Sequence, residues 1–559
     1  MTTRTVAAAG TVAELVQRRW GDRRTGLRSR GTVLTYHDVA AGAAARAALL
    51  VELLPRGAEP HLGVLLDNTP EYPLWLGAAA LAGAAVAGIN PTRRGAELAR
   101  DIVHTECRVL VTQRAYLPLL EGLALPDVRV LVTDTDAYGA LLAPYEGAKP
   151  GEAVVRPVGP ASRMLLYFTS GSTGAPKAAI CSQGRLAVAG ASLVTQLGVR
   201  RDDVHYICMP MFHGNAVIAD WAPALVAGAG VALRERFSAS GFLPDVREFG
   251  ATYFTYVGRA VQYLLATPER PDDRAHGLRL GFGTEAGAVD TARFAERFGV
   301  RLVEGYGSSE GGAAIQRTPD TPRGATGRAA PGDALAVVDA ETGEDCAPAR
   351  FSEAGVLLNG AAAIGELVNK GRNPFEGYWR NPEAEAERRR AGWYWTGDLF
   401  YRDEAGFLYF AGRTDDRLRV DSENLAAAVI ENILARWEDA TGAAVYAVPD
   451  PVAGDLVMAA LAMREGREFV PARFERFLRA QEDLGTKMPP RFVRVVRALP
   501  TTATNKIHRA SLRRDAFVCD DPVWWRPTPT SGYEPLTPTS LTGLRTTYES
   551  QARAELIWR

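Results

Sequence analysis

Short apolar segments alternate with helix-like stretches along most of this chain, and this alternation constrains the fold more than any other feature. Most of the segments end in Gly, Pro, Asn or Ser, and a helical pattern then follows. Such alternation is typical of parallel α/β layers, in which ligand sites collect at the carboxyl ends of the strands. The expected strands are His61–Asn68, Val128–Asp134, Met164–Ser170, Val204–Pro210, Tyr253–Gly258, Leu278–Gly283 and Arg301–Gly307.

The pattern changes after Asn369. Gly392–Arg413 reads as antiparallel hairpins with a D-E-A-G turn. Beyond it we expect a compact α+β unit and then, from Asp520, an irregular extension rich in Pro, Thr and Trp. The elements expected in that unit are helices over Ser422–Trp437 and Pro471–Asp483 and strands over Ala443–Val448, Leu456–Met463 and Phe492–Val496.

A chain of 559 residues is too long for one core, because single cores rarely exceed roughly 250–300 residues. The sequence predicts an α/β protein with a large multi-layer N-terminal domain containing mixed sheets, followed by a small α+β C-terminal domain. The predicted ranges are residues 1–413, residues 414–520 and a C-terminal extension over residues 521–559.

Composition excludes several classes of function. The 64 basic and 65 acidic residues balance, so bulk charge gives no support for nucleic-acid or membrane-surface binding. The five cysteines are scattered without a C-x-x-C pair, which favours a reducing compartment over a disulfide framework or a structural zinc site. The apolar run Trp75–Ile89 is too short to span a bilayer and predicts a core helix leading into a strand. We therefore expect a cytoplasmic protein, a monomer or homodimer, without a membrane span.

The stretch Tyr167–Ile180, YFTSGSTGAPKAAI, is the strongest local signal for anion binding. Gly171 and Lys177 have the separation of the Walker loop G-x-x-x-x-G-K-[ST], but Pro176 and Ala178 replace its second glycine and its Ser/Thr. Glycines allow close backbone approach to phosphate oxygens, and hydroxyls add donors. The alternative is an ordinary surface turn, where Ser, Thr and Gly often cluster.

Four more motifs follow in chain order. They are EGYGSSEGG (Glu304–Gly312), WTGDL (Trp395–Leu399), GRTDDRLRVDSENLAAAVIE (Gly412–Glu431) and LPTTATNKIHR (Leu499–Arg509). With the Ser/Thr/Gly loop they resemble the adenylate-forming superfamily of acyl-CoA synthetases, luciferases and peptide-synthetase adenylation domains. Tyr253–Leu265, Pro374–Trp379 and Tyr533–Pro538 resemble its fatty-acid-transport-protein branch, which contains very-long-chain acyl-CoA synthetases.

The resemblance implies a two-step reaction. A carboxylate attacks the α-phosphate of ATP, pyrophosphate leaves, and a thiol, usually CoA, then displaces AMP. Such chemistry depends mainly on positioning and charge stabilisation. The residues that the resemblance assigns to nucleotide binding are Thr169, Ser170, Gly171, Ser172, Thr173, Gly174, Lys177, Gly281, Gly283, Tyr306, Gly307, Asp398 and Arg413.

Individual roles follow from the same resemblance. Residues 170–174 and Lys177 are expected to hold the β- and γ-phosphates, Tyr306 to pack on adenine, and Asp398, helped by Arg413, to accept the ribose hydroxyls. Four residues are expected to take part in the chemistry or its metal: Ser309 at the α-phosphate, Glu310 on Mg²⁺, Lys506 at the carboxylate and α-phosphate oxygens, and His213 at the acyl pocket. Asp415 matches the hinge about which the small domain swings.

The acid pocket is expected to involve His213, Tyr256, Gly258, Arg259 and Phe282. For His213 the alternative is a partly buried histidine satisfied by its neighbours. Arg259 stands where the transporter-like branch tends to have glutamate. A buried arginine is costly unless paired, so it either binds a second carboxylate or polar group of the substrate or forms an ion pair with a neighbouring acid.

Further positions depart from the superfamily pattern: Ala178, Gln183, Phe282, Arg419, Ser422 and Asn505. Ser422 replaces a glycine in the loop expected to line the path of the thiol, and a side chain there could narrow that path. The leading interpretation is an acid–CoA ligase that uses ATP, Mg²⁺ and CoA. The alternative is an ATP-dependent diazotase of secondary metabolism, which adenylates nitrite and transfers the nitroso group to an aryl amine such as an aminocinnamic or aminocoumaric acid.

Overall fold

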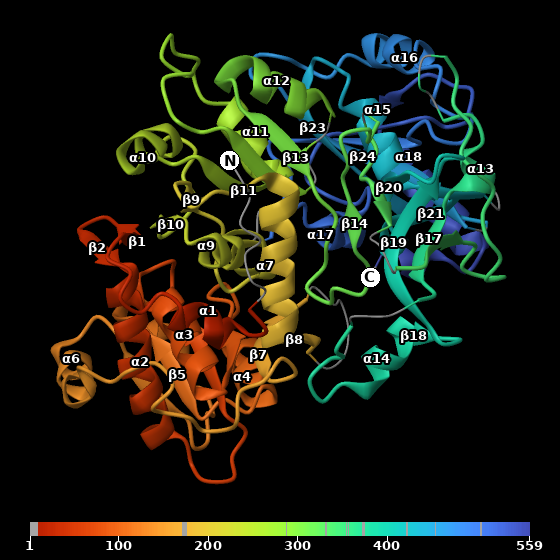
Figure 1. The fold of residues 1–559 in the computed structure, drawn as a ribbon. Helices are drawn as coiled ribbons and strands as arrows, with labels where there is room; N and C mark the ends of the chain where they lie inside the picture. Colours follow the sequence, from red (N-terminus) through yellow and green to blue (C-terminus); the bar gives the residue numbers. More distant parts are fainter. Residues whose placement is uncertain are drawn as a thin grey trace. The chain divides into compact units, whose positions relative to one another are not determined.

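The structure is a computed structural model, and it describes residues 9–558 except for a few short segments. Those segments are residues 170–175, 285, 287, 323, 330–332, 354, 356, 372–374, 421–422, 453 and 503–505. The chain divides into two compact units (Figure 1): residues 1–286, 290–312 and 374–390 form the first, and residues 287–289, 313–373 and 391–559 form the second. The boundaries predicted after residues 413 and 520 stay predictions.

The first unit contains two mixed sheets. In the six-stranded sheet all neighbours run parallel except the last pair, and its order is β6 (Arg129–Val132), β5 (Val109–Thr112), β3 (His61–Leu65), β4 (Ala85–Gly88), β7 (Arg163–Phe168) and β8 (Ala178–Ser182). The seven-stranded sheet has the order β13 (Arg301–Glu304), β12 (Leu280–Thr284), β11 (Tyr253–Val257), β9 (Val204–Ile207), β10 (Gly230–Leu233), β1 (Thr25–Ser29) and β2 (Thr32–Thr35). All seven predicted strands are present, and the predicted α/β class with mixed sheets is confirmed.

One predicted helix-after-strand connection is wrong. β7 is followed by the antiparallel strand β8, and the helix α7 (Gln183–Leu197) begins only after it. Thr169 N–H donates to the carbonyl of Lys177 at 3.0 Å, so the Ser/Thr/Gly loop is closed at its base as a hairpin connection. A Walker loop leads directly into a helix, whereas here a strand follows the loop.

The apolar run Trp75–Ile89 forms a core helix and a strand, as predicted. α3 (Glu71–Ala82) is buried along its length from Tyr72 onward and packs against α2 (Tyr36–Leu53). Gly83 ends it in the left-handed conformation, with φ 73°, and β4 follows at once. An added Cβ at Gly83 would come within 2.3 Å of the Arg156 carbonyl oxygen, so only glycine fits this turn.

The first unit contains further helices. They are α1 (Val12–Gln17), α4 (Gly95–His104), α5 (Leu117–Leu120), α6 (Asp136–Leu142), α8 (Gly214–Ala216), a π-helix (Val217–Trp221), α9 (Ala222–Ala227), α10 (Phe242–Phe249), α11 (Gly258–Leu265), α12 (Ala288–Phe298) and α14 (Pro382–Arg388), with short 3₁₀ turns at Arg114–Tyr116 and Ala143–Tyr145.

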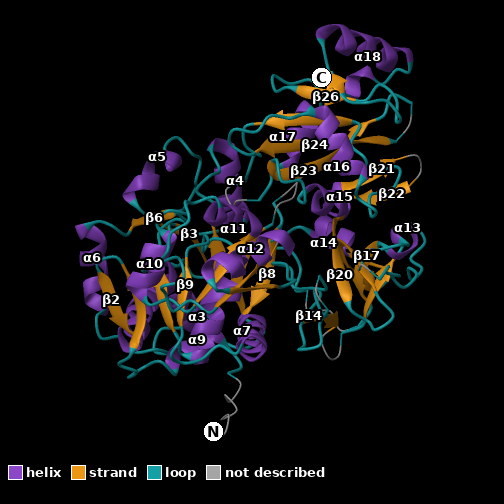
Figure 2. Cartoon of the chain, turned by 90° about the horizontal axis from the view of Figure 1, so that it is seen from above, coloured by secondary structure: helices purple, strands orange, loops and turns teal. Residues whose placement is uncertain are grey.

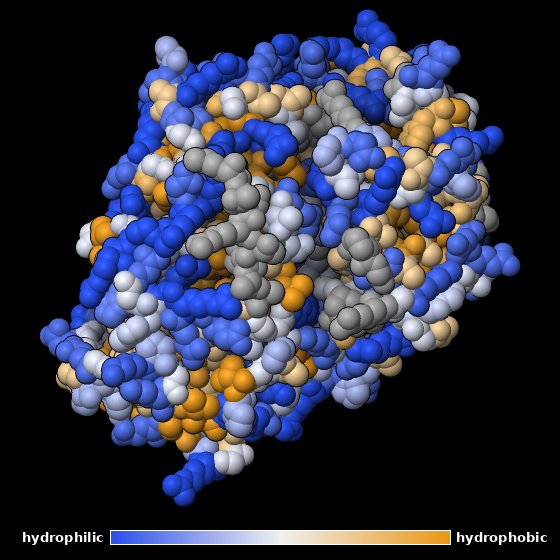
Figure 3. All heavy atoms as spheres, in the orientation of Figure 1, coloured by the Kyte–Doolittle hydropathy of each residue, from blue (hydrophilic) through white to orange (hydrophobic). Residues whose placement is uncertain are grey.

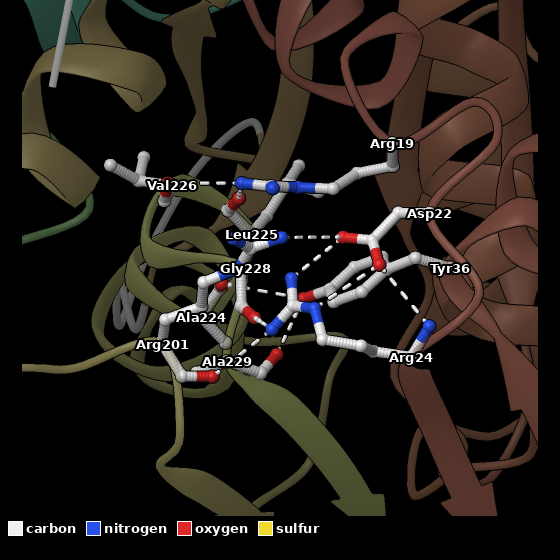
Figure 4. Close-up of polar contacts among 10 residues, drawn as sticks. All are labelled: Arg19, Asp22, Arg24, Tyr36, Arg201, Ala224, Leu225, Val226, Gly228 and Ala229. Carbon is white, nitrogen blue, oxygen red and sulfur yellow. Dashed lines mark hydrogen bonds and ion pairs between the residues drawn. The ribbon is translucent and has the colours of Figure 1, made fainter.

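Side chains from the N-terminal segment hold the C-terminal end of α9 (Figure 4). The Arg19 guanidinium donates to the carbonyls of Leu225 at 2.6 Å and Val226 at 3.1 Å, and Arg24 donates to that of Gly228 at 3.1 Å. The buried Tyr36 hydroxyl donates to the carbonyl of Ala229 at 2.5 Å. The last carbonyls of a helix lack partners within it, so these donors satisfy groups that would otherwise be orphaned.

Removing one of these donors gives the first prediction. Tyr36→Phe leaves the Ala229 carbonyl without its buried donor, which is expected to lower the free energy of unfolding by about 1–3 kcal/mol. Thermal or denaturant unfolding of the purified variant measures the change. Tyr145→Phe is the matched control, since its hydroxyl donates to Glu52 at an exposed site where water can replace it. Equal stability of the two variants would contradict the role assigned to the Tyr36 hydroxyl.

The second unit begins with antiparallel strands. β16 (Leu335–Val338), β17 (Gly365–Asn369), β19 (Trp393–Arg402) and β20 (Leu408–Arg413) pair in that order, and the hairpin predicted over Gly392–Arg413 is confirmed as β19–β20. The unit also contains the pair β14 (Ile315–Gln316) and β15 (Arg328–Ala329), the helix α13 (Gly360–Ala363) and a 3₁₀ turn over Thr414–Asp416.

The C-terminal part of this unit is α+β, as predicted. Its sheet has the order β23 (Ala440–Pro449), β24 (Asp455–Met463), β25 (Phe492–Val496), β26 (Val523–Trp525) and β27 (Glu534–Pro535). Its helices are α15 (Ala427–Leu434), α16 (Pro471–Arg479), α17 (Arg509–Asp515) and α18 (Pro538–Ser550), with a final 3₁₀ turn at Ala554–Leu556.

Two expectations for this region are wrong. The helix predicted from Ser422 starts only at Ala427, because Glu423–Ala426 forms β22 and pairs with β21 (Arg417–Val420). The extension from Asp520 is not irregular: it adds β26 and β27 to the sheet and continues into α18, drawn next to β26 in Figure 2, and the final 3₁₀ turn. Its two tyrosines are buried, Tyr533 at 6% and Tyr548 at 0% exposure, and this burial organises the segment despite its Pro and Thr content.

Polar and charged side chains predominate on the face seen in Figure 3, with apolar ones scattered in small groups. No helix among the described residues is long and apolar enough to cross a membrane. Within the same residues, no group of three or more His, Cys, Asp or Glu side chains forms a candidate metal cluster.

Candidate active site

The carboxyl ends of β11, β12 and β13 bring several predicted site residues to one edge of the seven-stranded sheet. Tyr256 lies opposite Gly283, and Gly283 lies opposite Glu304. A Cβ at Gly283 would come within 2.3 Å of the Tyr256 carbonyl oxygen, so this strand end requires glycine. The predicted neighbourhood of Tyr256, Gly283 and the 304–312 segment is therefore present in the first unit.

Phe282 packs onto this edge. A Cβ at Gly305 would meet the Phe282 ring at 2.2 Å, so the ring lies directly against the backbone that precedes Tyr306. Phe282 is half-buried, as is Tyr306. The Phe282 ring therefore narrows the space beside Tyr306, the residue expected to pack on adenine.

Glu304 is a residue that sequence reasoning did not single out. The Tyr256 hydroxyl donates to its Oε1 at 2.7 Å, and the N–H of Ala286 donates to the same oxygen at 3.2 Å. These contacts join the ends of β11 and β13 across β12. No local pattern signals them, since the two side chains are 48 positions apart in the sequence.

The predicted metal residue, Glu310, is buried, with 7% of its surface exposed. The Tyr378 hydroxyl donates to its Oε1 at 2.9 Å. Burial and the neighbouring Glu310 carboxylate raise the pKa of Tyr378, which keeps the phenol protonated as a donor at neutral pH. Tyr378 thus orients Glu310, and it too was missed in the sequence.

Ser309 is fixed through its backbone. Arg185 donates to the carbonyl of Ser309 at 2.5 Å and to that of Ile180 at 2.8 Å. One guanidinium therefore joins the 304–312 segment to β8, the strand that follows the Ser/Thr/Gly loop. Arg185 thus connects the two segments that carry many of the predicted nucleotide-binding residues.

Lys177, at the end of that loop, forms an ion pair with Glu387 of α14 at 2.9 Å. Thr169 is half-buried at the end of β7. Ser170, Gly171, Ser172, Thr173 and Gly174 lie outside the described residues, as do Ser422 and Asn505. The phosphate-binding role of the loop stays a prediction.

His213 is the N-cap residue of α8 and packs against Phe212, with ring centroids 4.7 Å apart. Asn68 holds the loop in front of it: its amide donates to the carbonyl of Met209 at 2.9 Å, and its Oδ1 accepts from the N–H of Met211 at 2.9 Å. The π-helix behind His213 is fixed by a buried pair, His205 Nδ1 to Asp220 Oδ1 at 2.9 Å. Asn68, His205 and Asp220 carry no sequence signal for these roles.

Arg259 lies in the first turn of α11, directly after Gly258. Among the described residues it has no carboxylate within ion-pair distance. Its Nη1 donates to Gln262 Oε1 at 2.9 Å, Gln262 donates to Asp290 at 3.1 Å, and the guanidinium lies 4.8 Å from the Tyr263 ring centroid. Its Nε is buried without a partner. Arg259 was expected either to bind a polar group of the substrate or to form an ion pair with a neighbouring acid. The described residues do not form that ion pair.

In the second unit, Asp398 and Arg413 face each other across β19 and β20. Asp398 is 6% exposed, and Arg413 Nε lies 3.5 Å from its Oδ1. The two predicted ribose-binding residues are thus brought together. The resemblance alone assigns ribose to them.

Lys506 lies near the end of a short hairpin in which Thr501 bridges to Ile507. The N–H of Thr502 donates to the Lys506 carbonyl at 2.7 Å, and the N–H of Lys506 donates to the Thr502 hydroxyl at 3.2 Å. At the predicted hinge, Asp415 lies in the 3₁₀ turn, and its neighbour Asp416 is held by Arg509 at 3.3 Å and Arg513 at 2.5 Å.

Known proteins that are similar to this chain are AMP-binding enzymes and CoA ligases. The family model of AMP-binding enzymes matches residues 14–379, and the model of their C-terminal domain matches residues 429–506. A steroid-22-oyl-CoA synthetase of Rhodococcus jostii RHA1 is 51% identical over 92% of each chain. The medium/long-chain-fatty-acid–CoA ligase FadD17 of Mycobacterium marinum is 43% identical over 90% of this chain and 95% of its own.

Among solved structures, the anthranilate–CoA ligase AuaEII with anthranoyl-AMP superimposes with a TM-score of 0.78 at 23% identity. The match covers 90% of this chain and 96% of that one. At this identity the likeness concerns the fold. The resemblance to the adenylate-forming superfamily inferred from the motifs is confirmed.

Proposed function

This chain belongs to the AMP-binding enzyme family, and we propose that the acid it activates is a steroid with a carboxylated side chain. The reaction is that of an AMP-forming ligase of the acyl-CoA synthetase type. A carboxylate oxygen forms a bond to the α-phosphorus of ATP and pyrophosphate leaves. The CoA thiol then attacks the acyl carbon, AMP leaves, and the thiol proton passes to solvent.

One observation carries the choice of acid. The relative named for a steroid-22-oyl substrate is 51% identical to this chain over 517 residues, whereas the relative named for medium- and long-chain fatty acids is 43% identical over 505 residues. Both matches extend over nine-tenths of this chain. The higher identity supports a rigid polycyclic acid over a flexible alkyl chain.

We assign the nucleotide to the residues that the resemblance implies. Lys177 and the loop before it hold the β- and γ-phosphates, Tyr306 packs on adenine, and the Asp398 carboxylate accepts the ribose hydroxyls. In the described residues Lys177 already binds an anionic group, the Glu387 carboxylate, which an arriving phosphate replaces. The Asp398–Arg413 pair supports the ribose role, because the guanidinium aligns a buried carboxylate whose oxygens accept hydrogen bonds from hydroxyl groups.

Glu310 fits a magnesium ion. Its Oε1 is oriented by Tyr378, and carboxylate oxygen is the ligand that Mg²⁺ favours. When bound, the ion neutralises charge on the phosphates. Lys506 supplies a further positive charge to the carboxylate and α-phosphate oxygens. We also propose a cytoplasmic location, since ATP and CoA are its co-substrates.

A competition experiment tests the choice of acid. The enzyme is given ATP, Mg²⁺ and CoA with equal concentrations of a steroid-22-oic acid and a C12 or C16 fatty acid, and the acyl-CoA products are separated by mass. We expect the steroid thioester to form at least about tenfold faster, a difference worth about 1.4 kcal/mol in transition-state binding. Preferential formation of the fatty acyl-CoA would contradict the proposal and favour the fatty-acid ligase instead.

A further inference from the structure

The C-terminal extension, residues 520–558, is built into the sheet of the small α+β part. β26 pairs with β25, with Trp525 opposite Phe492, and the N–H of Leu536 donates to the Val523 carbonyl at 2.8 Å. Alternate residues of a strand point to opposite faces of a sheet. The extension therefore contributes side chains to both faces, and the two faces bear different clusters.

One face carries the cluster that we call the lysine-face cluster. Its members on the strands include Met458, Ala460 and Phe492. Leu499 also belongs to this cluster, and Ile507 packs against the cluster. These two residues flank Lys506 in the sequence. From the extension it takes Tyr548, Ile557 and Trp558.

Contacts within this cluster lead from the extension toward the lysine. Tyr548 is fully buried, and its hydroxyl donates to the carbonyl of Pro449 at 2.6 Å. Its ring lies 5.5 Å from Trp558 and 6.1 Å from Phe517. Phe517 follows α17, the helix that begins three residues after Lys506, and Leu512 of α17 belongs to the same cluster.

The other face carries the opposite-face cluster, to which Val457, Ala459 and Val493 belong. There the extension contributes Tyr533, which is 6% exposed and lies 5.6 Å from Phe474. The N–H of Tyr533 donates to Glu475 at 2.8 Å, and its hydroxyl donates to the Pro490 carbonyl. Leu499, Ile507 and Leu512 do not belong to this cluster.

We propose that the C-terminal extension is a positioning element for Lys506: through Tyr548 and its neighbours it backs the hairpin and helix that flank this residue. The inference rests on the proposed role of Lys506 in adenylation. A lysine on a flexible stem gains catalytic effect only if its backbone is held, because a misplacement of about 1 Å can cost about 10²-fold in rate. In the described part of the hairpin Lys506 pairs with Thr502 and Thr501 with Ile507, and Leu499 and Ile507 anchor both sides of it in the lysine-face cluster.

The two tyrosines of the extension make a matched pair of variants. Tyr548→Ala removes a buried ring from the lysine-face cluster, and Tyr533→Ala removes one from the opposite-face cluster. Two half-reactions are measured on the folded full-length enzymes: pyrophosphate release with acid and ATP, and thioester formation from preformed acyl-adenylate and CoA. Tyr548→Ala is expected to slow pyrophosphate release about 10–100-fold and to leave thioester formation within about twofold. Tyr533→Ala is expected to leave both rates of the folded fraction within about twofold.

Two further variants keep the test decisive. If Tyr548→Ala does not fold, Trp558→Ala opens the same cluster from its half-buried rim and is expected to slow pyrophosphate release in the same selective way. In a Lys506→Ala background, either lysine-face substitution is expected to cause no additional loss, since the group that it positions is gone.

Three outcomes would overturn the proposal. They are equal effects of the Tyr548 and Tyr533 variants on pyrophosphate release, equal losses in both half-reactions, or full additivity with Lys506→Ala. Normal adenylation by Lys506→Ala alone would instead show that the assigned role of the lysine is wrong. The lysine variant thus separates failure of the proposed mechanism from failure of the positioning role.

Discussion

Lys506→Ala is expected to lower the rate of adenylate formation by about 10²–10³-fold, the loss typical of removing one positioned charge from a developing anion. The fold is expected to survive, because the backbone of Lys506 makes the pairings with Thr502 and its side chain is not part of either C-terminal core cluster. Pyrophosphate release with acid and ATP, measured before CoA is added, reports this step directly.

Two control measurements accompany the Lys506→Ala variant. Lys149→Ala removes an exposed lysine of the first unit and is expected to leave the rate unchanged. Thioester formation from preformed acyl-adenylate is expected to survive in the Lys506 variant, since the α-phosphate bond has by then been made. A Lys506→Ala enzyme that releases pyrophosphate at the normal rate would refute the role given to this residue.

Glu310→Gln is the second substitution with a large expected effect. It keeps the side-chain shape and the capacity to accept from Tyr378 but removes the charge, so we expect kcat to fall by about 10²-fold and the Mg²⁺ concentration for half-maximal rate to rise. Steady-state rates over a Mg²⁺ titration at saturating ATP measure both quantities.

The control for Glu310 is Glu344→Gln, an exposed carboxylate whose loss is expected to change neither quantity. Tyr378→Phe provides an intermediate case. It leaves the charge of Glu310 in place but frees the carboxylate to rotate, so a smaller rise in the Mg²⁺ requirement is expected. An unchanged Mg²⁺ dependence in Glu310→Gln would mean that the metal is held elsewhere.

The alternation of apolar segments was sufficient to predict the α/β architecture. Segments such as Leu278–Gly283 are short, apolar and bounded by breakers, and strands with both faces covered have this composition. The turn residues also predicted the β19–β20 hairpin, whose D-E-A-G turn contains Gly406 at φ 84°. These features depend on a few neighbouring residues, which one sequence displays.

Pairing between distant segments was harder to predict. Glu423–Ala426 leads into an alanine-rich helical pattern, yet it forms a strand because Arg417–Val420 lies opposite it. The extension after Asp520 reads as irregular from its composition. Tyr533 and Tyr548 order it by burial in two cores that also contain strand residues far away in sequence, such as Val457 and Met458.

For the site, the motifs located residues but not their partners. Glu310 was predicted from its motif, while Tyr378, which orients it, is 68 positions away and belongs to another segment. Asn68 gives no signal beyond a polar residue at a strand end, although it fixes the loop before His213. Such contacts depend on the packing of the two sheets, which no local window contains.

The most direct test of the account is product analysis with two sets of substrates. The enzyme is incubated with ATP and Mg²⁺ and either a steroid-22-oic acid with CoA or nitrite with an aminocinnamic acid, and AMP and organic products are quantified. We predict one AMP and one acyl-CoA per ATP in the first mixture and no AMP above background in the second. AMP that forms with nitrite and the aryl amine, and not with CoA and the acid, would contradict the assignment as an acyl-CoA synthetase.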